Sequence, residues 1–229
     1  MLFDILNRMK VLIIGGSRGI GWELAKIYSL ADDVVVVTGR KQPDQDSDKI
    51  EFEKLDLSTG KYIEDIESLV KKIGKIDRLV FAPGYYQEGT ITDLEPPEIL
   101  DMIQVCGTAF IFVVRSVLNN QNELDECIVI TSSSQWTPRK LEPIYNFTKA
   151  GLGHFAHALS QDERVKKVLV AGPTGTKTAF HEGREVDMST YHAPAWVAQQ
   201  IHDYSEGKFN YKFIKILRDP AEVEVSTVE

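Results

Sequence analysis

A short apolar run near the start of the chain leads directly into a glycine-rich turn. The run Lys10-Val11-Leu12-Ile13-Ile14 is followed by Gly15-Gly16-Ser17-Arg18-Gly19-Ile20-Gly21, and residues 22–30 then repeat apolar side chains with helical spacing. Glycines at the end of a buried strand let a ligand approach the backbone, and the start of the next helix offers unpaired N–H groups and a favourable dipole. This pattern predicts a pyrophosphate-binding turn in an α/β fold, with a tight turn that binds nothing as the alternative. A nucleoside triphosphatase loop is disfavoured, because no Gly-Lys-Ser/Thr closes the run.

Further apolar runs follow along the chain and alternate with helical stretches. With 229 residues and 43% hydrophobic content, the chain can bury one large core. The alternation predicts a Rossmann-type, doubly wound α/β domain with a parallel sheet of about seven strands and helices on both faces. We expect the strands near Val11, Val35, Glu51, Leu79, Ile128, Val168 and Phe213.

Three segments of this single domain, residues 1–229, stand apart from the regular elements. Residues 1–8 are interpreted as a short leader that packs Leu2, Phe3 and Leu6 on the surface. Residues 41–49 are too short and too polar for a full helix, so we expect a loop between the second and third strands. Residues 219–229 are expected to form a C-terminal tail.

Tyr145 and Lys149 stand four residues apart in a segment with helical spacing, and Ser132 lies thirteen residues before the tyrosine. Residues four apart lie on the same helix face, so the Lys149 ammonium can sit beneath the Tyr145 hydroxyl. A free tyrosine ionises at about pH 10, and a nearby cation lowers its pKa toward the range in which a general acid or base works. Solvated or packing residues can show the same spacing, so the meaning of the pair depends on the motifs around it.

The charge and the apolar runs of the chain restrict its partners. A net charge of −8 would repel nucleic acid and anionic membranes over most of the surface. No apolar run approaches the roughly 20 residues of a membrane span, and residues 1–10 lack the features of a secretory signal, so we expect a cytoplasmic protein. Cys106 and Cys127 have no metal-ligand spacing, and His154 and His157 lack acidic or cysteine partners, so we expect separate thiols and no metal.

Together these motifs resemble the short-chain dehydrogenase/reductase family, whose first glycine motif is Thr-Gly-x-x-x-Gly-x-Gly and whose catalytic set is Asn, Ser, Tyr and Lys. Residues 14–21 match every glycine of that motif and replace its threonine with isoleucine. Other family landmarks follow in the expected order, namely Leu55-Asp56-Leu57-Ser58, Phe81-Ala82-Pro83-Gly84 and Gly172-Pro173-Thr174-Gly175-Thr176. The resemblance extends from about residue 10 to about residue 216, which is nearly the whole chain.

The resemblance implies an oxidoreductase that transfers a hydride between a nicotinamide and a carbonyl or secondary alcohol of a small substrate. Tyr145 is expected to give or take the proton on the substrate oxygen, and Ser132 to hold that oxygen by a hydrogen bond, with Ser133 as the alternative. Lys149 is expected to lower the pKa of the tyrosine and to contact the nicotinamide ribose. The residues implied in cofactor binding are Gly15, Ser17, Arg18, Gly19, Ile20, Gly21, Arg40, Asp56, Leu57, Ala82, Gly84, Tyr145, Lys149, Pro173, Thr174, Gly175 and Thr176.

Three positions depart from the family pattern. The catalytic asparagine of the family falls on Cys106, which keeps the main-chain carbonyl but not the amide, so the proton relay is expected to be slower or rearranged. Loss of activity stays open as an alternative. Phe81-Ala82 replace two asparagines, which we interpret as a packing change, and Ala171 replaces a proline that mainly stiffens a turn.

The end of the second predicted strand indicates which cofactor is preferred. A site that selects NAD would be expected to carry an Asp or Glu there to hold the ribose 2′-hydroxyl. This chain has Gly39-Arg40-Lys41 instead, and the planar guanidinium of Arg40, with Arg18 in the glycine turn, suits a 2′-phosphate. NADP(H) is therefore expected over NAD(H), with ordinary surface arginines as the alternative.

Four aromatic residues follow the landmarks that border the reactive face of the family: Tyr85, Tyr86, Trp136 and Phe180. We expect them either to line a substrate pocket or to be ordinary packing residues. Residues 177–193, which form a lid over the substrate in the family, are short and polar here. They favour an open pocket or a lid that orders when ligand binds.

The resemblance also implies a homodimer or homotetramer. The helices concerned would supply apolar side chains either to subunit faces or to the core: Phe110, Phe112, Val113, Phe155 and Ala158.

Two other functions stay open. A non-catalytic NADP(H)-binding sensor is favoured by Cys106 and opposed by the retention of Ser132, Tyr145 and Lys149. A methyltransferase would bind S-adenosylmethionine and would not need the tyrosine–lysine pair.

Overall fold

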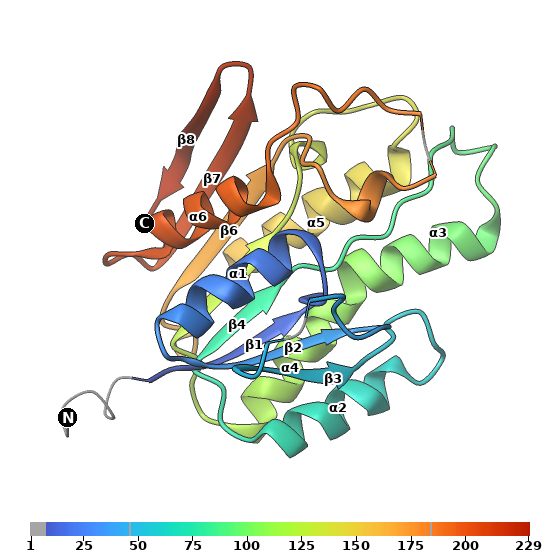
Figure 1. Ribbon diagram of the computed structural model, residues 1–229. Coiled ribbons are helices and arrows are strands. Elements are labelled where there is room, and N and C mark those ends of the chain that lie inside the picture. The colour runs from blue at the N-terminus through green and yellow to red at the C-terminus, as the bar shows by residue number, and fades with distance from the viewer. Residues whose placement is uncertain (1–7, 46, 184) are drawn as a thin grey trace.

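The computed structural model describes residues 8–45, 47–183 and 185–229, which form a single α/β layered domain (Figure 1). Its sheet has eight strands in the order β3-β2-β1-β4-β5-β6-β7-β8. The strands are β1 (Lys10–Ile14), β2 (Val34–Gly39), β3 (Ile50–Lys54), β4 (Arg78–Phe81), β5 (Glu126–Ile130), β6 (Val168–Pro173), β7 (Tyr211–Arg218) and β8 (Ala221–Val228). The α-helices are α1 (Gly19–Leu30), α2 (Tyr62–Ile73), α3 (Pro96–Ile103), α4 (Ala109–Asn120), α5 (Pro143–Leu159) and α6 (Pro194–Ser205). The predicted doubly wound fold is confirmed.

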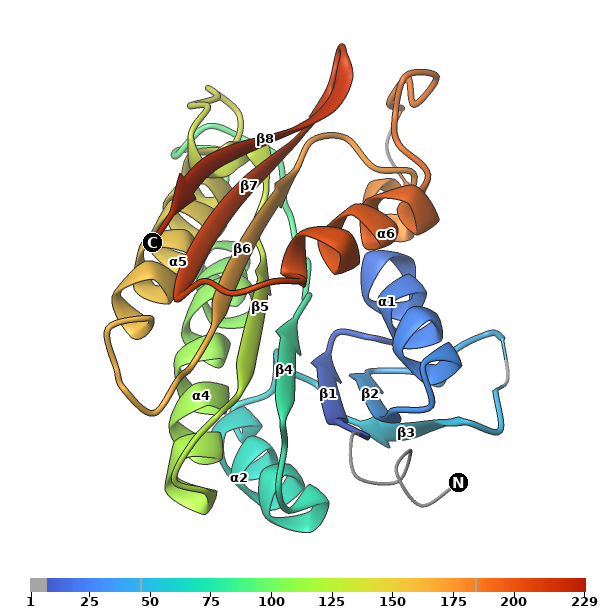
Figure 2. The same ribbon diagram turned by 90° about the vertical axis from the view of Figure 1, so that its left-hand side faces the viewer.

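Helices cover both faces of the sheet, as Figures 1 and 2 show together. Alternate residues of a strand point to opposite faces, so Leu12 and Ile14 of β1 pack with α2, α4 and α5, whereas Val11 and Ile13 pack with α1 and α6. This explains why β1 and β5 are almost continuously apolar, as is usual for parallel strands that are buried on both sides.

The C-terminal segment differs from the prediction. Residues 219–229 were expected to be a tail, but Ala221–Val228 form β8, which pairs antiparallel with β7 and brings the sheet from the expected seven strands to eight. Valine and glutamate alternate over residues 222–225 of β8, a period of two that is typical of a strand, although most of β8 is exposed. The Lys215 ammonium of β7 lies 2.7 Å from the Glu224 carboxylate across the pair. The pattern was present in the sequence, but its many glutamates resemble a solvated tail.

Two other segments for which predictions were made are the connection between β2 and β3 and the start of the chain. The connection between β2 and β3 contains no helix among its described residues, so the predicted loop crossover is confirmed there. Residues 1–7, which include Leu2, Phe3 and Leu6 of the expected leader, lie outside the described residues.

One helical stretch is longer and more apolar than the sequence analysis expected. Pro96–Asn120 runs through α3, the π-helical turn η2 (Gln104–Thr108) and α4, and its 25 residues are long and apolar enough to cross a membrane by length and composition alone. A core helix passes the same test. Ala109, Phe110, Val113 and Val117 of this stretch are fully buried against the sheet and its neighbouring helices, and 33% of its most apolar 18-residue window is buried.

Candidate active site

A cavity of about 760 Å³ opens at the carboxyl ends of the parallel strands. The strand order reverses between β1 and β4, because the chain moves outward from β1 to β3 and then crosses back to β4. At such a switch point the loops after neighbouring strands leave in opposite directions and a crevice forms between them. The cavity is lined by the loops after β1, β2, β4, β5 and β6, which carry most of the predicted site residues.

The glycine turn is shaped to receive a ligand on its backbone. Gly15 has a φ of +78°, and a Cβ there would lie 2.8 Å from the nitrogen of Pro83. At Gly21 a Cβ would lie 2.6 Å from the Gly15 carbonyl oxygen, so no side chain fits at either position without displacing backbone. Helix α1 begins at Gly19, and its first N–H groups have no partner within the helix. The turn therefore presents donors and a positive dipole end to the cavity, as a pyrophosphate requires.

A threonine that the sequence analysis missed holds this turn in place. The Gly15 N–H donates to Thr38 Oγ1 at 3.2 Å, and the Gly16 N–H donates to the Thr38 carbonyl at 2.9 Å. Thr38 lies in β2 and is buried, so it ties the turn to the neighbouring strand. A threonine directly after four consecutive valines of the same strand was the available signal.

Every residue predicted to bind the cofactor lines this cavity. Arg40 directly follows β2 and is exposed, and the Arg18 guanidinium lies 3.8 Å from the Glu182 carboxylate. A side chain at Gly39, the last residue of β2, would overlap Ser17 Oγ, and that position carries no carboxylate.

Asp56 lies on the adenine side implied by the family resemblance. Partial burial tends to raise the pKa of Asp56, but hydrogen bonds from the Ser58 hydroxyl and N–H, at 2.7 and 3.0 Å, lower the pKa below its ordinary value. The side chain is therefore ionised and held by the next turn of backbone.

Ser132, Tyr145 and Lys149 converge on the same cavity. Ser132 follows β5, whereas Tyr145 and Lys149 lie on α5, which begins at Pro143, a residue suited to a first helical position because it has no N–H to lose. Lys149 is only 2% exposed; its ammonium lies 5.6 Å from the centre of the Tyr145 ring and donates to the Ile130 carbonyl at 3.2 Å. The predicted i, i+4 arrangement on one helix face is present. Ser133, the alternative to Ser132, also lines the cavity but its hydroxyl is engaged by Arg139.

The expected acidic phenol is not present in this structure. Burial raises the pKa of Tyr145 well above its ordinary value, Cys106 and Glu142 act in the same direction, and the Ser132 hydroxyl opposes them. Burial also lowers the pKa of Lys149, because the enclosed ammonium loses its water. The prediction that Lys149 makes the tyrosine unusually acidic is therefore wrong here, since burial of the phenol dominates.

Cys106, at the position of the family's asparagine, supports backbone and does not line the cavity. It is fully buried in η2; its Sγ accepts from the Tyr85 N–H and donates to the Tyr85 carbonyl, both at 3.2 Å. Burial raises the pKa of the thiol, with Lys149 opposing. The thiol thus anchors the loop after β4, a task for which an amide is not required.

Three of the four predicted pocket aromatics line the cavity, and the fourth does not. Tyr86 and Phe180 stack at 5.6 Å between ring centres and lie 5.2 and 5.7 Å from the Tyr145 ring, while Tyr85 borders the same space. Trp136 is a packing residue, the other alternative for these aromatics: its side chain turns into the sheet and packs against Phe213, with ring centres 5.8 Å apart. The absent side chain of Gly172 leaves the room that the indole fills.

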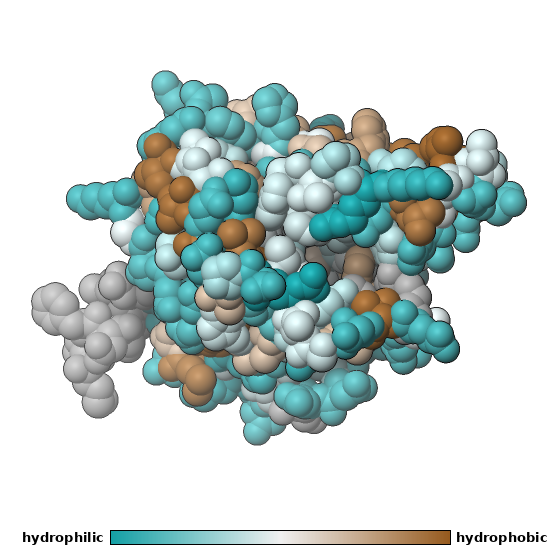
Figure 3. Space-filling view, turned by 90° about the horizontal axis from the view of Figure 1, so that it is seen from above, coloured by the Kyte–Doolittle hydropathy of each residue, from teal (hydrophilic) through white to brown (hydrophobic). Residues whose placement is uncertain are grey.

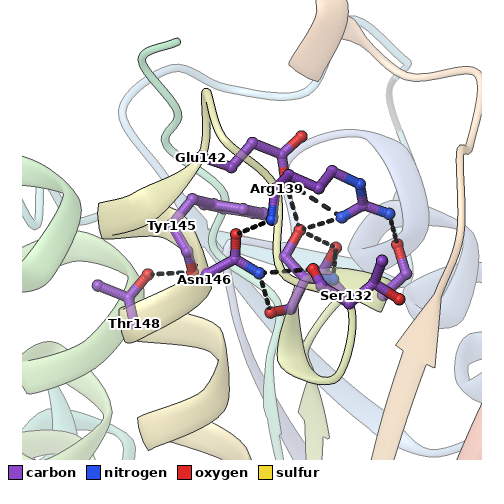
Figure 4. A network of polar contacts seen from close by, with 9 residues as sticks. Ser132, Arg139, Glu142, Tyr145, Asn146 and Thr148 are labelled. Carbon is purple, nitrogen blue, oxygen red and sulfur yellow. Dashed lines mark hydrogen bonds and ion pairs between the residues drawn. The ribbon is translucent and has the colours of Figure 1, made fainter. Parts of the chain in front are cut away.

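A polar network that was not predicted from the sequence lies beside Ser132 (Figure 4). Arg139 and Glu142 line the cavity, and their charged groups lie 3.2 Å apart. Both contact the Ser134 hydroxyl, and Asn146 reaches the same loop from α5. The cluster is formed by tertiary contacts between a loop and a helix, so no single sequence motif predicts it.

One of the histidines contacts the C-terminal residue. His157 Nε2 lies 3.0 Å from the Glu229 carboxylate, and the His157 ring stacks on Tyr211 at 3.9 Å. Within the described part of the chain, no group of three or more His, Cys, Asp or Glu side chains is arranged to hold a metal ion.

Comparison with known proteins agrees with this geometry. The profile of the short chain dehydrogenase family matches residues 9–188. Benzil reductase ((S)-benzoin forming) of Saccharomyces cerevisiae is 25% identical over 176 residues, which cover 69% of this chain and 67% of that protein. The 2-dehydro-3-deoxy-D-gluconate 5-dehydrogenase of Formosa agariphila is 25% identical over 164 residues, which cover 66% of this chain and 62% of that enzyme, less than two thirds of its length.

A solved structure shows the same fold. The short chain dehydrogenase of Burkholderia cenocepacia, in complex with NADP, superimposes with a TM-score of 0.75 at 19% identity and covers 91% of this chain and 97% of that chain. The matched profile spans the glycine turn, Ser132, Tyr145 and Lys149. The chain therefore belongs to the short-chain dehydrogenase/reductase family.

Proposed function

We propose that the protein is an NADP(H)-dependent oxidoreductase that interconverts a carbonyl and a secondary alcohol of a small substrate. The observation that carries this proposal is the meeting of Ser132, Tyr145 and Lys149 in the cavity that also contains the glycine turn. The matched relatives support it, since one is named a benzil reductase and another a sugar-acid dehydrogenase. A pure binding protein has little need for the three residues together.

The cofactor site is assigned to the residues that fit it. The backbone of Gly15 to Gly21 and the start of α1 would hold the pyrophosphate, and Asp56 and Leu57 would border the adenine. Arg40 and Arg18 would hold a 2′-phosphate, because both line the cavity and their planar guanidinium groups suit a phosphate, whereas Gly39 carries no carboxylate. The NADP bound to the Burkholderia cenocepacia protein agrees with this choice. When bound, the nicotinamide supplies or accepts the hydride.

The substrate oxygen is assigned to two hydroxyls. Ser132 would donate a hydrogen bond to it, and Tyr145 would exchange its proton with it. Because burial raises the pKa of Tyr145, the phenol is protonated at neutral pH and carries the proton that the oxygen of a reduced carbonyl would take. Tyr86 and Phe180 exclude water from the phenol by covering its ring, and Lys149 would contact the nicotinamide ribose.

A screen of carbonyl compounds tests this proposal. NADPH absorbance would be followed with benzil, with 2-dehydro-3-deoxy-D-gluconate and with a panel of small ketones and aldehydes. We expect at least one compound to consume NADPH, and Tyr145→Phe to abolish turnover while still binding NADPH. A protein that binds NADPH but reduces no compound, and whose behaviour is the same in Tyr145→Phe, would instead be the sensor.

The remaining expectations concern partners and location. Ile111 and Phe147 are 42% and 64% exposed and flank an apolar hollow of about 220 Å³ between η2, α4 and α5, which would suit a second subunit. Phe110 and Val113 are fully buried, so they belong to the core and not to such a face. The face seen in Figure 3 is mainly hydrophilic, with hydrophobic residues in small separate groups. We propose a cytoplasmic homodimer or homotetramer with a small-molecule substrate and no nucleic-acid or membrane partner.

A further inference from the structure

The side chain of Asn146 fastens the segment after Ser132 to helix α5 (Figure 4). Its Nδ2 donates to the carbonyl oxygens of Ser134 at 2.6 Å and Thr137 at 2.8 Å, and its Oδ1 accepts from the Arg139 N–H at 3.2 Å. An asparagine amide has two N–H donors and one carbonyl oxygen. All three therefore hold the main chain of one loop, which we call the serine loop (residues 132–139).

Ser134 is held a second time through its hydroxyl. Its Oγ donates to Glu142 Oε2 at 2.7 Å and accepts from Arg139 Nη1 at 2.9 Å, while Arg139 Nη2 reaches the neighbouring Ser133 Oγ at 2.8 Å. Ser134 is only 3% exposed, whereas the side chains of Arg139 and Glu142 are 37% and 22% exposed, so these contacts are partly shielded from competing water. The residue is fixed both at its carbonyl, by Asn146, and at its side chain.

Ser134 in turn sets the position of the Ser132 hydroxyl. The Ser134 N–H donates to Ser132 Oγ at 3.2 Å, and the two hydroxyl oxygens lie 3.3 Å apart. One acceptor site of Ser132 Oγ is therefore taken by the loop itself. The position of this hydroxyl relative to Tyr145 depends on how the serine loop packs against α5, because α5 carries both Tyr145 and Asn146.

We infer that Asn146 is a positioning residue, which holds Ser132 Oγ at its working place opposite the Tyr145 hydroxyl by fastening the serine loop to α5. Asn146 is not among the residues that line the cavity, so it acts through Ser132 and not on the substrate. The inference rests on the proposed function, because it assigns one substrate oxygen to Ser132 and Tyr145 together.

A double-mutant cycle on Asn146 and Ser132 tests the inference. Steady-state kinetics would be measured with NADPH and benzil, or with the carbonyl compound that the screen finds to react fastest. We expect Asn146→Ala to lower kcat about 10-fold to 100-fold while the KM for NADPH stays unchanged, because a small misplacement of a reacting group costs this much. Once Ser132→Ala has removed the hydroxyl, adding Asn146→Ala should change kcat less than about twofold. Independent, multiplying losses in the double variant would overturn the inference.

Two further variants control for poor folding of Asn146→Ala and for the loss of an amide hydrogen bond far from the cavity. Asn146→Asp keeps the shape and the oxygen acceptor but loses both N–H donors, and should behave as Asn146→Ala does if the latter folds poorly. Asn120→Ala is the control. It removes an amide that donates to the Gly74 carbonyl at 3.3 Å, at the C-terminal end of α4, and should leave kcat unchanged.

Hydrogen exchange separates this inference from the proposed function. If the unmodified protein reduces no carbonyl compound, the proposed function fails by itself, and amide exchange of residues 132–139 then decides the inference. Faster exchange there in Asn146→Ala, with the rest of the chain unchanged, supports it. Exchange that matches the unmodified protein overturns it.

Discussion

Replacing Arg40 by glutamine should weaken NADPH binding and leave NADH binding almost unchanged. Arg40 follows β2 at the cavity wall, and a side chain at the preceding Gly39 would overlap Ser17 Oγ. Glutamine keeps much of the length and polarity of arginine but removes the charge and the planar fork that suits a phosphate. The variant therefore isolates the recognition of the 2′-phosphate.

The size of the effect follows from the exposure of Arg40. Hydrogen bonds between charged groups contribute about 1.5–3 kcal/mol, and exposed pairs lie at the low end because water competes. Since about 1.4 kcal/mol is a factor of ten, the Kd for NADPH should rise about 10-fold, with about 100-fold as the upper bound. NADH has no 2′-phosphate, so its Kd should change less than about twofold. Raising the salt concentration should narrow the difference in Kd for NADPH between the unmodified protein and Arg40→Gln, because the lost contact is electrostatic.

Titration of both nucleotides by intrinsic fluorescence measures this directly. Arg115→Gln is the matched control, since Arg115 pairs with Glu67 at 3.0 Å on the outer surface of α4 and α2, does not line the cavity, and should not alter either Kd. Equal weakening of NADPH and NADH binding in Arg40→Gln would show a general disturbance of the site. No change in either would refute the assignment of the 2′-phosphate to Arg40.

Three further outcomes are expected. Gly21→Ala should cost about 1–3 kcal/mol of stability and weaken NADPH binding, because its Cβ would lie 2.6 Å from the Gly15 carbonyl oxygen; urea unfolding and nucleotide titration check both. Phe110→Ala should cost about 3–5 kcal/mol in the same unfolding assay, because the fully buried ring packs against Phe81 and Phe155. Partial burial tends to raise the pKa of Asp77, but hydrogen bonds from the Lys10 N–H and from Lys75 lower this pKa overall. The ionised carboxylate therefore stabilises the fold above the pKa of the unfolded chain, and this stabilisation is lost as the pH falls through the lower pKa of the folded state. In Asp77→Asn, the free energy of unfolding should fall less steeply with decreasing pH.

Features encoded within a few neighbouring residues could be predicted from the sequence. The strand, the glycine turn and the helix start are consecutive, and the positions of Tyr145 and Lys149 follow from one turn of helix, so both were placed correctly. The loop between β2 and β3 was equally local. Each of these depends on backbone geometry that nearby residue types fix.

Features that depend on distant segments could not be predicted in the same way. Trp136 turns into the sheet because Gly172, on another strand, leaves room for it. Strand β8 has no buried residue of its own and forms because the edge of β7 offers backbone hydrogen bonds to it. The pKa of Tyr145 is set by the burial that Tyr86, Phe180 and the surrounding helices impose, which the i, i+4 pair with Lys149 does not reveal.

The most direct test of the central claim is to follow the hydride itself. NADPH deuterated at the transferred position of its nicotinamide C4 would be incubated with the protein and the best carbonyl compound, and the alcohol product analysed by mass spectrometry. Deuterium on the former carbonyl carbon, absent when Tyr145→Phe binds the same NADPH, is the predicted result. An NADPH-saturated protein that forms no deuterated alcohol, or a Tyr145→Phe variant that forms it at the unmodified rate, would contradict the account.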